Sequence, residues 1–208
     1  MRYYIADCHF FHEALNREMD HRGFASVEEM NEYMIKRWNE KVRNRDEVVI
    51  LGDLSMGNAE QTNALLDRLQ GKLFLIVGNH DNRYLRSKTF HKERFGWIYP
   101  YAELHDDGRK VVLSHYPIAC YNGQYLKNKK GEPRTYMLYG HVHDTMDQRL
   151  IERFQDITRN TRRTDRNGKE VHIPCNMINC FCMYSDYTPL TLDEWIICDR
   201  ERRKASGG

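Results

Sequence analysis

The sequence predicts a mixed α/β fold in which strands and helices alternate. Three observations support this prediction: short apolar runs rich in β-branched and aromatic residues, amphipathic segments between the first of these runs, and the lack of any linker or internal repeat. Alternation of strand and helix favours crossover connections and a largely parallel sheet. Since 208 residues can bury one full core, a single domain is expected over residues 1–204, with residues 205–208 as a disordered tail.

Five apolar runs are predicted to be buried strands, because each is short and is ended by Gly, Asp, Asn or His. In chain order they are Tyr3–Ala6, Val48–Leu51, Leu73–Val77, Lys110–Leu113 and Tyr136–Tyr139. The sequence after residue 95 is richer in strand-forming residues than the sequence before it. The sequence therefore leaves open whether the strands of that later part pair in parallel, as in the first part, or antiparallel.

Two helices are predicted between the first three strands from their caps. Ser26 and Glu29 form a capping-box pattern at the start of the first helix. Its apolar positions share helical spacing and are Val27, Met30, Met34 and Trp38. Asn58 is expected to cap the second helix, and Gly71 to close it in the left-handed conformation.

The last third of the chain is predicted to begin with one more amphipathic segment. Its apolar residues are Met146, Leu150, Phe154 and Ile157. The polar stretch 159–169 is typical of an exposed loop. Residues 171–183 and 190–198 are predicted to be closing strands.

The charge balance is far from the strongly basic one that is typical of a dedicated nucleic-acid binder, because 32 basic residues nearly match 30 acidic ones and the formal net charge is only +2. Nucleic acid nevertheless stays open as a partner. The six cysteines form no C-x-x-C pair and are interpreted as reduced thiols. No apolar run resembles a signal peptide or is long enough to span a bilayer, so a cytoplasmic location without a membrane partner is expected.

Each of the five predicted strands is followed at once by residues that can bind a metal. These residues are Asp7, His9, Asp53, Asn79, His80, Asp81, His115, His141 and His143. Because the carboxyl ends of strands are where ligands gather in α/β sheets, these side chains are expected to converge on one crevice. Within the pairs that lie two residues apart, an extended backbone would point both side chains to the same face and turn Cys8 into the core.

The chemistry of these side chains suits divalent cations. Imidazole nitrogens, carboxylates and an amide without any thiolate favour Mn, Fe, Zn or Ni over a closed structural zinc site. Even without His80 and Asp81, seven candidate ligands remain. This number exceeds what one such ion takes from a protein while it keeps an open coordination position. Two divalent metal ions are therefore predicted as cofactors.

In their order, the blocks D-x-H, G-D, G-N-H-D, H and G-H-x-H resemble the signature of the calcineurin-like metallophosphoesterase family, and the resemblance covers the whole chain. It implies a four-layer sandwich of two mixed β-sheets flanked by helices, with a dimetal site at the carboxyl ends of the strands. It also implies the ligand sets: Asp7, His9 and His143 for the first metal, Asn79, His115 and His141 for the second, and Asp53 as the bridge.

The resemblance further implies a phosphoesterase in which a metal-bridging hydroxide attacks phosphate esters, most simply phosphodiesters or nucleotide-like small molecules. His80 would then donate a proton to the leaving group, and Asp81 would orient the His80 ring through a hydrogen bond. His12 and Arg83 lie near these blocks in sequence, and whether either contacts substrate is open.

Two other functions compete with this one. The first is a catalytically silent protein-binding scaffold of the same fold, which the complete ligand set disfavours. The second is a nuclease of the same family. A protein phosphatase is disfavoured because residues 52–57 lack the expected Arg and position 81 is Asp rather than Glu. The sequence does not decide the oligomeric state.

Overall fold

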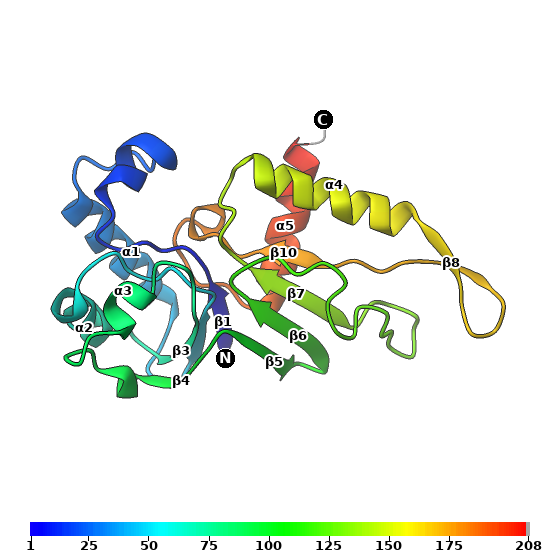
Figure 1. Ribbon diagram of the computed structural model, residues 1–208, viewed down its shortest axis with the longest axis horizontal. Coiled ribbons are helices and arrows are strands. Elements are labelled where there is room, and N and C mark those ends of the chain that lie inside the picture. Colours follow the sequence, from blue (N-terminus) through cyan, green and yellow to red (C-terminus); the bar gives the residue numbers. More distant parts are fainter. Residues whose placement is uncertain (207–208) are drawn as a thin grey trace.

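The structure is a computed structural model that describes residues 1–206 and has the predicted α/β architecture (Figure 1). Its described residues form two four-stranded sheets and one small two-stranded sheet. Each large sheet presents the carboxyl ends of several parallel strands, and this edge is where the site residues follow. No helix within residues 1–206 has the length and apolar character needed to cross a membrane.

The first sheet is entirely parallel and has the order β1-β2-β3-β4. Its strands are β1 (Arg2–Ile5), β2 (Glu47–Ile50), β3 (Lys72–Ile76) and β4 (Phe95–Tyr99). The connections are made by η1 (Leu15–Met19), α1 (Val27–Lys41), α2 (Ala59–Arg68), α3 (Asn82–Leu85) and η2 (Lys92–Arg94). The predicted crossover connections and parallel pairing are thus confirmed for this half, and β4 is an added strand.

The helices of this half begin where the caps predicted. The Ser26 hydroxyl accepts a hydrogen bond from the backbone N–H of Glu29 at 3.1 Å. Asn58 and Gln61 form a reciprocal capping box at the start of α2, with bonds of 2.8 and 2.9 Å. Gly71 has the predicted left-handed conformation, with φ of +101°, but it does not close α2, because the helix already ends at Leu69 in an extended conformation. Gly71 instead lies in the turn before β3.

The second sheet is mixed and has the order β10-β7-β6-β5. Its strands are β5 (Tyr101–Asp106), β6 (Arg109–Ser114), β7 (Thr135–Tyr139) and β10 (Met177–Asn179). Only β5 runs antiparallel to its neighbour, whereas β6, β7 and β10 are parallel. Both kinds of pairing therefore occur after residue 95.

The two large sheets share a buried core, because alternate residues of each strand point to opposite faces. On β1, Tyr4 packs towards β6 and β7 of the second sheet, whereas Ile5 packs towards α1 and α2. The outer face of the second sheet packs against α4 (Met146–Asn160) through residues such as Met137 and Phe154. The predicted amphipathic segment is therefore α4.

The prediction of a closing strand over residues 190–198 is wrong, because this segment begins helix α5 (Leu192–Ser206). The Thr191 hydroxyl accepts from the N–H of Glu194 at 3.3 Å, while the Glu194 carboxylate accepts from the N–H of Thr191 at 2.8 Å. This reciprocal cap starts a helix. Helix α5 includes two residues of the predicted tail, and residues 207–208 lie outside the described part of the chain.

The predicted loop at residues 159–169 is also different in the structure. It contains the end of α4 and a hairpin of β8 (Arg162–Thr164) and β9 (Glu170–His172), which projects from the body of the molecule at the right of Figure 1. Sequence periodicity did not reveal these strands because both faces are exposed and polar. The predicted strand 171–183 is divided into β9, β10 and η3 (Cys182–Ser185).

Candidate metal centre

The structure brings together all seven predicted ligands at the carboxyl ends of five strands. Asp7 and His9 follow β1, Asp53 follows β2, Asn79 follows β3, His115 follows β6, and His141 and His143 follow β7. Two groups of three residues have ligand atoms within 4.8 Å of one another. These groups are Asp7, His9 and His143, and Asp53, His115 and His141.

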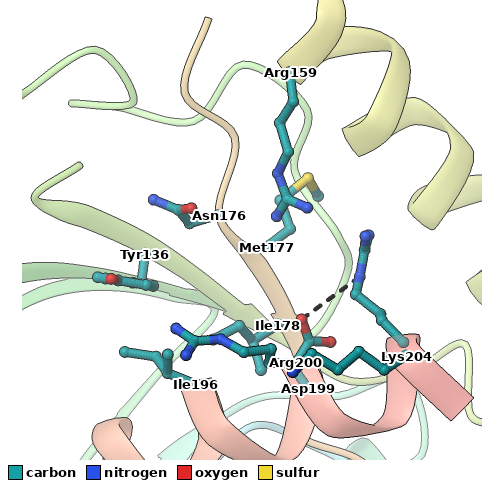
Figure 2. Close-up of a pocket in the computed structure, with 10 residues that line it drawn as sticks. Tyr136, Arg159, Asn176, Met177, Ile178, Ile196, Asp199, Arg200 and Lys204 are labelled. Atoms are coloured by element: carbon teal, nitrogen blue, oxygen red, sulfur yellow. Dashed lines mark ion pairs between the residues drawn. The ribbon is translucent and has the colours of Figure 1, made fainter. Parts of the chain in front are cut away.

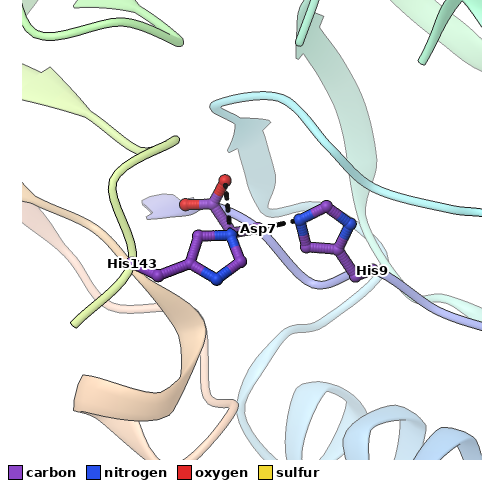
Figure 3. Close-up of side chains that lie close together, drawn as sticks. All are labelled: Asp7, His9 and His143. Carbon is purple, nitrogen blue, oxygen red and sulfur yellow. Dashed lines mark hydrogen bonds and ion pairs between the residues drawn. The ribbon is translucent and has the colours of Figure 1, made fainter. Parts of the chain in front are cut away.

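The first group is drawn in Figure 3, where the rings of His9 and His143 lie beside the Asp7 carboxylate. Nε2 of His143 lies 3.2 Å from Nε2 of His9 and 3.7 Å from Oδ1 of Asp7. Both Asp7 oxygens also accept from the backbone N–H of His141, at 2.9 and 3.0 Å. Asp7 and His9 are buried, so this is a buried carboxylate with two imidazoles turned towards one point.

Asp53 connects the first group to the second. Its Oδ2 lies 3.6 Å from Nε2 of His9 and 3.4 Å from Nε2 of His115. Oδ1 of Asn79 lies 3.0 Å from Nε2 of His115 and 2.9 Å from Nδ1 of His141. The amide oxygen therefore joins the second group, and one carboxylate lies between both groups.

The backbone of the ligands is strained. Five of them have φ between +47° and +70°, a region that residues other than Gly rarely adopt: Asp7, His9, Asp53, His141 and His143. Each such residue costs about 1–3 kcal/mol, and such residues cluster at functional sites. The expectation that the paired ligands lie on extended backbone is thus wrong, since they converge from turns that follow the strands. Cys8 is buried in the core, as expected.

Two glycines of the ligand blocks are required by close approach. A Cβ atom on Gly52 would overlap the His115 ring, and one on Gly78 would overlap the Asp53 carboxylate. Gly52 also has φ of +90°, which other residues rarely adopt. Glycine at these positions lets the β2 and β3 turns come close enough for the second group to assemble.

The ionisable side chains of the site shift one another's pKa values. Burial would raise the pKa of Asp53, but the hydrogen bond and positive charge of His115 outweigh it and lower that pKa to about 2. Burial opposes charge on His115 as well, yet Asp53 and Asp7 raise its pKa to about 9. Burial raises the pKa of Asp7 to about 6 and lowers that of His9 well below its usual value. The contact of His115 with Asp53 thus favours positive charge beside this buried carboxylate.

The structure places His80 beside this cluster with its side chain 41% exposed. Its backbone N–H donates to Oδ1 of Asp53 at 2.9 Å, and its Nε2 lies 4.0 Å from Oδ2 of the same residue. The ring is 5.3 Å from the ring of His9. His80 therefore faces both the cluster and solvent.

Asp81 has a different role from the one predicted. Its fully buried carboxylate accepts from the backbone N–H groups of Asp53, Leu54 and Gly78, at 2.9, 2.9 and 2.7 Å, and from the Tyr84 hydroxyl at 2.7 Å. Four donors occupy the carboxylate, and none of its hydrogen bonds within residues 1–206 goes to the His80 ring. The predicted orientation of His80 by Asp81 is thus wrong, and Asp81 instead fixes the turns that carry Asp53 and Asn79.

Two residues near the site that sequence reasoning left open have separate positions. His12 accepts from the N–H of Leu15 at 3.1 Å, and its ring lies edge-on to that of His9. Arg83 is exposed on α3. Tyr116, next to the candidate ligand His115, is 48% exposed, and the centroid of its ring lies 4.5 Å from that of the His141 ring.

Asp20 and Arg22 were not identified from the sequence. Oδ1 of Asp20 lies 2.8 Å from Nδ1 of His143, and Arg22 forms an ion pair with Asp20 at 2.9 Å. Neither belongs to a recognisable motif, and Asp20 is far from His143 in sequence. Only the fold reveals this contact.

A separate pocket of about 400 Å³ lies between α4, α5 and the amino ends of β7 and β10 (Figure 2). Arg159, Asp199 and Arg200 line it, and none of the seven candidate ligands does. Arg159 donates to the backbone oxygen of Cys175 at 2.7 Å and to the Gln155 side chain at 2.9 Å. These bonds give Arg159 a structural role, and the pocket is distinct from the ligand cluster.

The donor set of the cluster fits divalent cations. It contains imidazole nitrogens, two carboxylates and one amide oxygen, which suit Mn, Fe, Zn or Ni. Two carboxylates this deeply buried also require positive charge nearby. The cluster is therefore a candidate centre for two ions.

Comparison with known proteins gives a consistent result. The sequence profile described as calcineurin-like phosphoesterase matches residues 3–188. An uncharacterized protein of Methanocaldococcus jannaschii, MJ1445, is 35% identical over 143 residues, which is 68% of each chain. The Gene 66 protein of Mycobacterium phage L5 is 28% identical over 170 residues, covering 69% of this chain and 78% of that protein.

A solved structure shares the fold. The protein of unknown function AQ665 from Aquifex aeolicus has a TM-score of 0.63 and 22% sequence identity. The similarity covers 93% of this chain and 96% of that one.

Proposed function

Because the chain belongs to the calcineurin-like phosphoesterase family, we propose that it is a dinuclear metal-dependent hydrolase of phosphate esters. The observation that carries this proposal is the convergence of seven oxygen and nitrogen ligands on two adjoining groups that share Asp53. We also propose that the two large sheets and their helices form the four-layer sandwich of the family.

The ligand sets follow the two groups. Asp7, His9 and His143 would hold one ion, Asn79, His115 and His141 would hold the other, and Asp53 would contribute to both. When bound, two divalent ions lower the pKa of water to supply the nucleophile and offset the charge that grows on the phosphoryl oxygens.

The residues of the chain divide the remaining work. His80, whose ring is next to the cluster and partly exposed, donates a proton to the departing oxygen. Asp81 holds the turns that carry Asp53 and Asn79, and it thereby fixes the position of the His80 backbone. Asp81 thus acts on catalysis through the backbone.

The substrate class proposed is a phosphodiester or a nucleotide-like small molecule. A diester carries a second organic group, which needs room beside the reacting phosphorus. The side of the cluster formed by Asn79, His141 and Tyr116 is exposed and provides such room. The Tyr116 ring next to His141 also offers an aromatic face to a flat leaving group.

The test compares hydrolysis of bis-p-nitrophenyl phosphate with that of p-nitrophenyl phosphate. Chelated protein is reloaded in turn with Mn, Ni, Zn and Fe, and the metal content is measured in the same samples. We expect metal-dependent turnover with close to two ions per chain and faster cleavage of the diester.

Other outcomes separate the alternatives. Strict cleavage of the monoester would overturn the substrate preference but keep the hydrolase. Cleavage of single-stranded DNA or RNA in preference to small esters would favour the nuclease. A chain that binds no metal and cleaves no ester would contradict the proposal and favour the scaffold.

A further inference from the structure

The segment between His12 and α1 carries a carboxylate that contacts the candidate metal centre from outside the ligand set. Asp20 directly follows η1, and its Oδ1 lies 2.8 Å from Nδ1 of His143. Both side chains are largely buried, with 6% and 12% of their surfaces exposed. Since water is mostly excluded, this contact is stronger than it would be on the surface.

The contact decides which nitrogen of His143 faces the centre. When Nδ1–H donates to a carboxylate, Nε2 is left without a proton and can bind a cation. Nε2 of His143 is the atom that lies 3.2 Å from Nε2 of His9 and 3.7 Å from Oδ1 of Asp7. Asp20 therefore selects the tautomer and the ring orientation that the first group requires.

Arg22 holds Asp20 in place. Its guanidinium has no exposed surface and donates to Oδ2 of Asp20 from Nε at 3.1 Å and from Nη2 at 2.9 Å. The same guanidinium donates to the backbone oxygens of Asp7 at 3.0 Å and Cys8 at 2.6 Å. One buried cation thus connects the Asp20 carboxylate to the turn that carries Asp7 and His9.

His115 provides the comparison within the molecule. Its Nδ1 lies 2.8 Å from the backbone oxygen of Leu51, which is a neutral acceptor. His143 instead has an ionised carboxylate as its partner, and a charged acceptor makes the stronger bond. The support of His143 is thus built by side chains and can be changed by mutation without changing the backbone.

We propose that Asp20, held by Arg22, is a positioning residue that orients His143 and raises its affinity for a divalent ion. The inference rests on the proposed function, because it assumes that His143 binds a metal. Asp20 itself is no ligand, since its Oδ1 contacts the far side of the ring. The unit is a carboxylate that acts on the ion through an imidazole.

The test measures the dissociation constant for Zn²⁺ by titrating metal-free protein against a competing chromophoric chelator. Asp20→Asn keeps a hydrogen-bond acceptor and removes the charge, whereas Asp20→Ala removes both. We expect weakening by about 10- to 100-fold, with Asp20→Ala the weaker binder, as for other partners of ligating histidines. Glu18→Gln is the matched control, because Glu18 is an exposed carboxylate in the same segment, and we expect it to bind as the wild type does.

A purely structural role is excluded by a second measurement. Because Asp20→Asn leaves the buried Arg22 cation without its ionic partner, the metal-free variant should melt below the metal-free wild type. Its affinity for the ion is therefore measured well below both melting temperatures, where a purely structural role would leave the affinity unchanged and a positioning role lowers it. Equal affinity of Asp20→Asn and wild type, with two ions bound to each, would overturn the role of Asp20 and leave the proposed function intact. A wild-type protein that binds no ion would overturn both.

Discussion

The two large sheets contribute different chemistry to the candidate centre. The first sheet supplies every oxygen ligand, from Asp7, Asp53 and Asn79, together with the imidazole of His9. The second sheet supplies only imidazoles, from His115 after β6 and from His141 and His143 after β7. Neither sheet alone holds a complete ligand set, so an ion would bind across the boundary between them.

This difference determines how charge is distributed in the centre. The negatively charged carboxylates come from the first sheet. The imidazoles, which become positively charged when they bind a proton, come mainly from the second sheet. The contact of 3.4 Å between Asp53 and His115 crosses the boundary. These two side chains would thus be neighbouring ligands contributed by different sheets.

The largest effect is expected from removing the charge that joins the two sheets. Asp53→Asn should reduce the metal content from about two ions to less than one, because Asp53 contacts ligands of both groups. Turnover should fall by more than the roughly 10- to 100-fold that follows the loss of a side chain that only hydrogen-bonds to a metal ligand. Metal analysis and diester hydrolysis measure both effects. Asp67→Asn, at an exposed carboxylate of α2, is the control. Unchanged metal content would argue against Asp53 as the bridge.

The next effect separates chemistry from metal binding. His80→Ala should keep both ions, because His80 is outside both ligand groups, yet slow turnover about 10²- to 10⁴-fold by removing a general acid. His91→Ala, at an exposed histidine, serves as the control. A variant that lost its ions together with its activity would show that His80 belongs to the ligand set instead.

Metal removal should weaken the connection between the sheets. An ion present at a hundred times its dissociation constant stabilises the folded state by about 2.7 kcal/mol. Thermal melting of wild-type protein with excess Mn²⁺ and after chelation measures this stabilisation. Asp53→Asn should show little difference between the two conditions. If wild type also showed none, the ions would not contribute to holding the sheets together.

The smallest effect lies within the second sheet, away from its carboxyl edge. Hydrogen bonds from Lys110 and Tyr101 hold the pKa of Glu103 at about 2, below its usual value. A lowered carboxyl pKa stabilises the fold above a pH of about 4.5, and this stabilisation is lost as the pH falls towards 2. Glu103→Gln should therefore cost about 0.5 kcal/mol at pH 7, since the pair is partly exposed, and less at pH 3. Urea unfolding at both pH values measures it, and altered metal content would contradict this local role.

The sequence predicted the first sheet better than the second for a physical reason. Strands β1, β2 and β3 are buried apolar runs, and α1 and α2 begin at side-chain caps, so local patterns determine them. In the second half, α5 was mistaken for a strand because its apolar residues are clustered. The capping pattern of Thr191 and Glu194 is the sequence signal that would have identified this helix.

The candidate site shows the same limit. Its seven ligands were predicted because each follows a strand, which is a local feature, and because the blocks that carry them resemble the family signature. The partners of Asp81 and the contact of Asp20 with His143 depend on turns that meet only in the folded chain. A carboxylate in a loop gives no sign in the sequence of the group to which it will bind.

The position of β1 has a consequence for biosynthesis. One edge of β1 pairs with β2, but Tyr4 on the other edge bridges Leu190, and the Trp195 indole donates to the Tyr4 backbone oxygen at 2.8 Å. During synthesis, β1 thus leaves the ribosome long before the segment that supplies its remaining partners. Such distant contacts form late. Nascent chains that stop before Leu190 should therefore emerge with the turn of Asp7 and His9 unsecured, so metal uptake would follow the synthesis of that segment.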